Sequence, residues 1–204
     1  MKFALLVAFA SVLGLSVTAS SVLPTACGPN ANILSESSFA HKGAEVKLST
    51  ISCPGSDVRG RGSLVNALKR QVVSQCDAVT NPCSSTVCDL RPEQPSLLDC
   101  NDLTIALDGL SDPLLIPPST GVIATLATCT YIYINLDTVE YSVCGSAFVA
   151  SPDGPIIRPK GTLGIDTTTH CFTTSTTSIG GICFSPQVPG NDWFVQVEAS
   201  SESG

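Results

Sequence analysis

Ten cysteines, all downstream of a segment with the features of an export signal, constrain this chain more than any other sequence feature. Lys2 is followed by an apolar run over residues 3–17 and by the small residue Ala19, as in a secretory signal peptide cleaved after residue 19. Because exported thiols mature in an oxidising compartment, their even number indicates disulfides rather than metal or redox chemistry. The predicted disulfide framework of this secreted, extracellular protein comprises Cys27, Cys53, Cys76, Cys83, Cys88, Cys100, Cys129, Cys144, Cys171 and Cys183.

Composition limits the partners that this chain can have. Its formal net charge is −7, and 13% of its residues are charged. Nucleic acids and anionic lipids require a basic face on the protein, so neither is an expected partner. The export segment is the longest apolar run, and it is shorter than the ~20 residues that a membrane-spanning helix needs. We therefore expect no membrane span, no cofactor, and an extracellular protein or a glycan as the partner.

The mature chain is long enough for one compact domain, since about 185 residues remain after removal of the signal peptide. Cysteine becomes frequent after about residue 70. The sequence thus predicts a signal peptide (1–19), an N-terminal extension (20–70), a cysteine-rich α+β domain (71–198) and a frayed tail (199–204).

The dibasic pair Lys69-Arg70 closes the N-terminal extension and has two interpretations. A dibasic step is a candidate site for a processing protease, which would make residues 20–70 a pro-segment. Alternatively, Ser63 caps a short helix that runs to Ser74, with the basic pair on its solvated face. The sequence leaves both alternatives open.

A helix is predicted after Pro95. Ser96 is a suitable N-cap, and the acidic Asp99 follows three residues later, near the positive end of the helix dipole. Gly109 and the prolines that follow it indicate the end. The predicted buried face comprises Leu97, Cys100, Leu103, Leu107 and Leu110, which recur at spacings of three or four.

Strands are predicted after that helix in the sequence. Residues 122–136 form one long strand with two apolar faces, which indicates a central position in a sheet. Residues 182–184 and 193–197 form a hairpin, and residues 141–149 fit either a helix or a strand. The expected fold is a small disulfide-stapled α+β sandwich with one or two helices packed on an antiparallel sheet.

Candidate catalytic and metal-ligating residues are few. Asp166 and His170 could serve a nucleophile, but no Gly-x-Ser-x-Gly elbow is present, and His170 is more simply a polar strand residue. Cys83 and Cys88 could hold zinc together with His170, yet thiols in an oxidising compartment pair instead. We therefore predict neither a catalytic residue nor a metal site.

Carbohydrate chemistry is the remaining alternative. Glycoside hydrolysis needs two carboxylates, for which Glu93, Asp99, Asp102 and Asp108 are available, and usually aromatic platforms. The candidate contact residues for a glycan or a protein partner are Trp193, Phe194, Tyr131 and Tyr133. The competing interpretation places these four side chains in the core. Tyr131 and Tyr133 share one face of a strand, so they share one role.

Ordered motifs over residues 52–198 carry a resemblance. They are residues 58–70, Cys76-x6-Cys83-x4-Cys88, Asp99-Cys100, residues 127–133, residues 180–183 and residues 193–197. With them the chain resembles a family of uncharacterised small secreted cysteine-rich proteins of basidiomycete fungi. It is also distantly similar to the fungal necrosis-inducing effector domain and its killer-toxin relatives, which have a small α/β sandwich. The resemblance implies a non-enzymatic, effector or toxin-like interaction protein; a glycan-binding module and an unusual secreted hydrolase are the alternatives.

Overall fold

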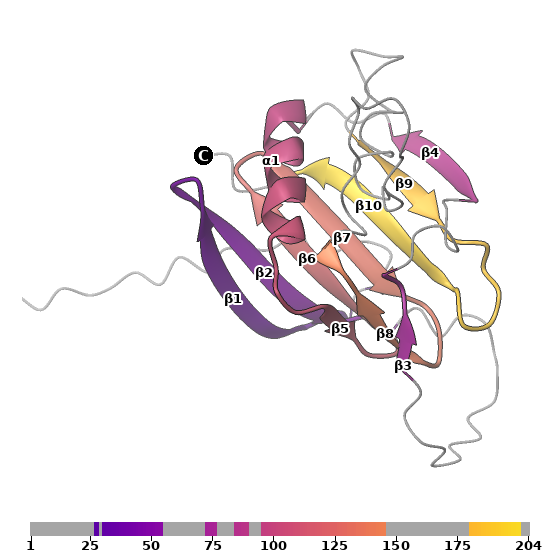
Figure 1. Ribbon diagram of the computed structural model, residues 1–204. Helices are drawn as coiled ribbons and strands as arrows, with labels where there is room; N and C mark the ends of the chain where they lie inside the picture. Colours follow the sequence, from indigo (N-terminus) through magenta and orange to yellow (C-terminus); the bar gives the residue numbers. More distant parts are fainter. Residues whose placement is uncertain are drawn as a thin grey trace, which may run out of the picture.

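The structure is a computed structural model in which one helix packs on a seven-stranded antiparallel sheet (Figure 1). A three-stranded sheet contributes to the same hydrophobic core as the helix. The predicted class, a disulfide-stapled α+β fold with a helix on an antiparallel sheet, is confirmed. The structure describes residues 27–28, 30–54, 72–76, 84–89, 95–145 and 180–200.

The large sheet places sequence-distant strands side by side. Its spatial order is β1 (Ile33–His41), β2 (Ala44–Ser52), β6 (Thr120–Leu126), β7 (Cys129–Asn135), β10 (Trp193–Ala199), β9 (Gly180–Phe184) and β4 (Ser85–Asp89). The small sheet has the order β3 (Val72–Ser74), β8 (Glu140–Val143) and β5 (Leu114–Ile116), and β3 runs parallel to β8. β7 therefore lies in the middle of the large sheet, and β1 and β4 form its edges.

Helix α1 (Leu97–Asp108) begins and ends where the sequence predicts. The Ser96 hydroxyl accepts a hydrogen bond from the Asp99 backbone N–H (3.4 Å). Gly109 is the C-cap, and its N–H bonds to the carbonyl oxygen of Ile105 (3.2 Å). No helix in the described residues is long and apolar enough to span a membrane.

The buried face of α1 agrees with the predicted face except at its first residue. Cys100, Leu103 and Leu107 are fully buried, and Leu110 is half-buried. Leu97 is 48% exposed, so its assignment to the buried face was wrong. The reason is positional: Leu97 opens the helix, one turn before the residues that reach the sheet.

The predicted single strand over residues 122–136 is two strands, β6 and β7, joined by a tight hairpin. The two turn residues are Ala127 and Thr128, and Ala127 has a positive φ of 49°. Turns of this kind usually contain glycine or asparagine, which mark them in a sequence. Because neither residue occurs here, the turn is hidden inside a continuous apolar run.

The central strand β7 is buried on both faces, as predicted. Tyr131 and Tyr133 lie in the core beneath α1. Ile132 and Ile134 belong to a second core on the opposite face of the sheet. The alternation follows from the two-residue period of a strand.

Residues of the predicted N-terminal extension supply β1 and β2, and β2 pairs with β6 of the large sheet. The hairpin turn is Lys42-Gly43, with φ of 48° and 84°, as in a type I′ turn. A register shift near Ile33 and Ser35 introduces an irregularity into β1. Residues 33–52 are thus an integral part of the sheet.

The helix alternative for residues 63–74 is wrong for its last three residues, because Val72–Ser74 is strand β3. Residues 63–71 lie outside the described part of the chain. The ambiguous stretch over residues 141–149 is strand up to Val143.

The predicted C-terminal hairpin is confirmed as β9 and β10. Its loop turns at Pro189-Gly190, where Gly190 has a φ of 80°. Ala199 belongs to β10, and the backbone N–H of the buried Ser200 donates to the carbonyl oxygen of Thr128 (2.8 Å). These two residues of the predicted tail therefore belong to the packed fold, and the rest of that tail lies outside the described residues.

Candidate interaction surface

Disulfides use all eight cysteines in the described residues. Three of the bridges are Cys27–Cys53, Cys76–Cys144 and Cys100–Cys129, and Cys88 and Cys183 are disulfide-bonded as well. Cys83 and Cys171 lie outside the described residues, so their pairing stays a prediction. A chain with several disulfides belongs to an oxidising compartment.

The four aromatic candidates for partner contact are core residues in the structure. Trp193, Tyr131 and Tyr133 are 1% exposed, and Phe194 is 5% exposed. Trp193 stacks on Tyr133 with ring centroids 5.6 Å apart. The core interpretation of these side chains is therefore the one that the structure supports, and they form no exposed aromatic patch.

Asp99 attaches the start of α1 to the β6–β7 turn. Its carboxylate accepts hydrogen bonds from the Thr128 hydroxyl (2.5 Å) and the Thr128 backbone N–H (3.1 Å). The Thr128 hydroxyl accepts from the Ser96 backbone N–H (2.8 Å). Together with the adjacent Cys100–Cys129 disulfide, these contacts give Asp99 a structural role at the helix start, as the sequence suggested.

A second carboxylate, Asp137, links two loops at the other end of β7. Its carboxylate accepts from the Gly190 N–H (2.6 Å), the Tyr141 hydroxyl (3.0 Å) and the Thr138 N–H (2.6 Å). The Tyr141 hydroxyl in turn accepts from the Asp192 N–H (2.8 Å). With this many donors bonded to it, the Asp137 carboxylate holds the two loops in place.

These buried tyrosines predict a response to alkaline pH. Burial raises the pKa of Tyr133 and of Tyr141 well above the ordinary value of 10.0. The folded state therefore favours the neutral phenols, so stability is unaffected below pH 10 and falls as the pH rises above it.

A titration followed by absorbance at 295 nm checks this expectation. We expect the native protein to keep at least two of its three tyrosines un-ionised at pH 10.5, with ionisation accompanying unfolding at higher pH. The protein in denaturant is the control, in which all three titrate near 10. Titration of all three tyrosines near 10 in the native protein would contradict the buried positions.

The outer face of α1 exposes three large apolar side chains. Leu98 is 76% exposed, Leu97 48% and Ile105 41%. Leu98 and Ile105 are seven residues apart, which places both on one side of the helix. The sequence indicates this surface, because Leu98 and Ile105 are apolar but do not belong to the residues whose spacing predicts the buried face.

Acidic residues surround this apolar face. Asp102 forms an exposed ion pair with Lys42 of the β1–β2 turn (2.7 Å). Asp108 is exposed in the last turn of α1, which contains no basic residue, and Asp112 follows on the surface. Because the C-terminal end of a helix dipole is negative, Asp108 adds to an unfavourable charge there. A positive group from outside would relieve it.

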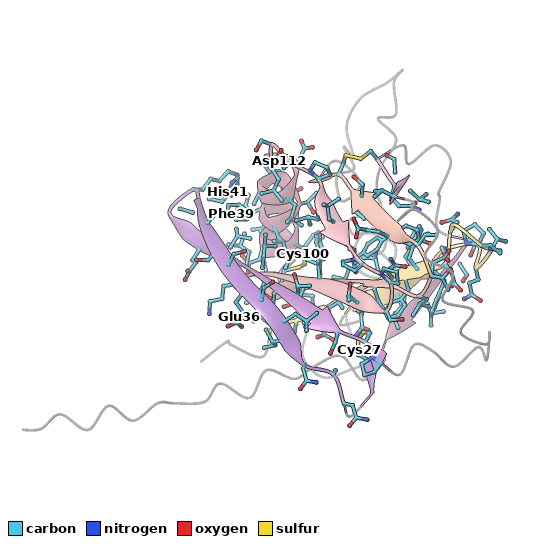
Figure 2. The ribbon with its side chains drawn as sticks, turned by 90° about the horizontal axis from the view of Figure 1, so that it is seen from below. Cys27, Glu36, Phe39, His41, Cys100 and Asp112 are labelled. Atoms are coloured by element: carbon cyan, nitrogen blue, oxygen red, sulfur yellow. A yellow bond between two sulfur atoms is a disulfide. The ribbon has the colours of Figure 1, made fainter. Side chains whose placement is uncertain are left out.

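One histidine lies in the described residues, and several of the predicted sites lie outside them. His41 is on β1, beside Phe39, which packs against the helix-side core (Figure 2). The His41 Nε2 atom is buried and has no hydrogen-bond partner within the described residues. The sites not described are Ala19, Lys69, Arg70, Glu93, Asp166 and His170. Among the residues that are described, no group of three or more His, Cys, Asp or Glu side chains could hold a metal ion.

No protein-family model, no curated protein and no solved structure matches this chain. In the described residues the chain is a mostly-β, cysteine-rich protein with one helix and several disulfides. The exposed surfaces of the chain itself are therefore the indication of what it binds.

Proposed function

We propose that this chain is a secreted, non-enzymatic interaction protein of effector or toxin-like type, and that the outer face of α1 binds its partner. The observation that supports the proposal is the exposure of Leu98 and Ile105 on a helix that is fixed to the sheet at its N-terminal end. Exposed apolar area of this kind contributes nothing to folding, whereas burial against a partner is favourable by about 25 cal/mol per Å².

The partner that fits this face is an extracellular protein with apolar side chains flanked by lysine or arginine. The apolar part would cover Leu97, Leu98 and Ile105, and the basic part would meet Asp108 at the negative end of the helix. A glycan is less well supported, because the aromatic side chains considered for stacking are buried.

A binding screen with matched variants tests this function. The purified chain is screened by interferometry against secreted proteins and receptor ectodomains, and each binder is measured again with the double substitution Leu98→Asp and Ile105→Asp. We expect affinity to fall by more than about 100-fold, because two apolar contacts are replaced by charges. Leu115→Asp is the control, since Leu115 is 57% exposed on β5 and should leave affinity unchanged.

Unchanged melting temperatures of the variants would show that folding is intact. Binding that survives the double substitution would move the interaction away from α1. A chain that binds nothing in the screen and turns over an ester or glycoside substrate would contradict the proposed function as a whole.

A further inference from the structure

The β1–β2 hairpin is attached to the rest of the fold by strand pairing along β6. Six residue pairs join β2 and β6 in antiparallel register, from Lys47 opposite Thr125 to Ser52 opposite Thr120. The backbone continues the attachment at Cys53, whose N–H donates to the carbonyl oxygen of Ser119 (2.8 Å). β2 is thus an interior strand, with β1 on one side and β6 on the other.

Both faces of β2 contribute to the cores of the protein. Val46 is fully buried in the core beneath α1, and Ile51 is fully buried in the core on the opposite face. Phe39 and Leu48 pack against the helix-side core as partly buried residues. At the hairpin turn, Lys42 pairs with Asp102 of α1. Removing the hairpin would therefore expose apolar surface in both cores and one edge of β6.

No disulfide joins the N-terminal hairpin to the rest of the sheet. Cys27 and Cys53 are bonded to each other, and they are the only cysteines before Cys76 in the sequence. Both thiols of the N-terminal part are consumed by this pair, so no disulfide can connect residues 27–54 to the sheet that they complete. The chain itself, through residues 55–71, is the covalent connection.

We infer that residues 27–54 are a permanent, non-covalently held part of the sheet, so that cleavage between residues 55 and 71 gives a two-chain protein and not a released pro-segment. The inference is independent of the proposed binding role of α1. It changes the expected outcome of processing at Lys69-Arg70, because the hairpin stays on β6 after the cut.

Cleavage with a dibasic-specific processing protease tests this inference, followed by size-exclusion chromatography and mass analysis of each peak. We expect the two chains in one peak in native buffer and in separate peaks in 6 M guanidinium without reductant. A C-terminal chain that elutes alone in native buffer would overturn the inference. So would two chains that stay together in guanidinium until a reductant is added.

Two hairpin variants sharpen the experiment. Ile51→Asp places a carboxylate in the buried contact and should increase release of the N-terminal chain at least tenfold. Ser38→Asp adds the same group at an exposed position of β1 and should release no more than the parent. Equal release from both variants would count against attachment through the core.

Hydrogen exchange of the uncut chain decides the question even if the protease does not cut or Ile51→Asp does not fold. If the hairpin is a permanent part of the sheet, the amides of Leu48–Ile51 exchange as slowly as those of β6 and β7. Exchange of these amides at least a hundredfold faster than those of β7 would mean that the hairpin detaches readily, and the inference would fail.

Discussion

Replacing Trp193 with alanine is expected to lower the free energy of unfolding by about 4 kcal/mol, the cost of removing a large aromatic side chain from a packed core. Trp193 is 1% exposed and stacks on Tyr133. Its ring N–H donates to the Asn191 side-chain oxygen (2.6 Å), which positions the β9–β10 loop. The substitution therefore removes core volume and a loop contact together.

Guanidinium unfolding followed by circular dichroism, with disulfides intact, measures this loss. Fluorescence is unsuitable because Trp193 is the single tryptophan of the chain. Trp193→Phe is the control: it keeps most of the ring volume and loses the N–H, so a loss of about 1–2 kcal/mol is expected. A loss below about 1 kcal/mol for the alanine variant would contradict the packing described for Trp193.

The second large effect is expected from the double substitution Cys76→Ser and Cys144→Ser, which should cost about 4 kcal/mol. This disulfide spans 68 residues of sequence, and closing a loop of that length removes much conformational entropy from the unfolded chain. It also fixes β3, which pairs with β8 over three residues only, at the end of the small sheet.

Urea unfolding of the oxidised double variant measures this effect. Both cysteines are replaced at once, since a single substitution would leave a thiol free to exchange with other disulfides. The Cys27→Ser and Cys53→Ser pair is the comparison, because its shorter loop of 26 residues predicts a loss smaller by about 1 kcal/mol on loop entropy alone. Unchanged stability of the Cys76 and Cys144 variant would show that this bridge does not constrain the unfolded chain.

Local signals in the sequence predicted the elements that they define directly. Ser96, Asp99 and Gly109 mark the two ends of α1, and apolar residues on both faces of the predicted strand indicate the two buried faces of β7. The β6–β7 turn was missed because Ala127 adopts a positive φ without a glycine or asparagine to signal it. Secondary structure is predictable from sequence where a residue type is nearly obligatory at a position, and the Ala127 turn is not such a case.

Contacts between distant segments could not be predicted. The pairing of β2 with β6 joins residues about 70 positions apart, and no pattern in either strand specifies its partner. The loop network around Asp137 depends in the same way on Gly190 and Asp192, which arrive from a different hairpin. The exposed face of α1 was predictable in part. The spacing of the apolar residues indicates that Leu98 lies outside the buried face, but it does not indicate what Leu98 contacts.

The register shift in β1 has a consequence for handling the protein at high concentration. A long, regular edge strand offers its free backbone groups to a second molecule and promotes fibre growth. The register shift near Ile33 and Ser35 makes β1 irregular, and the next residue, Glu36, is charged. The opposite edge, β4, is five residues long. Crystals and concentrated solutions should therefore contain discrete molecules and no sheet-to-sheet polymers.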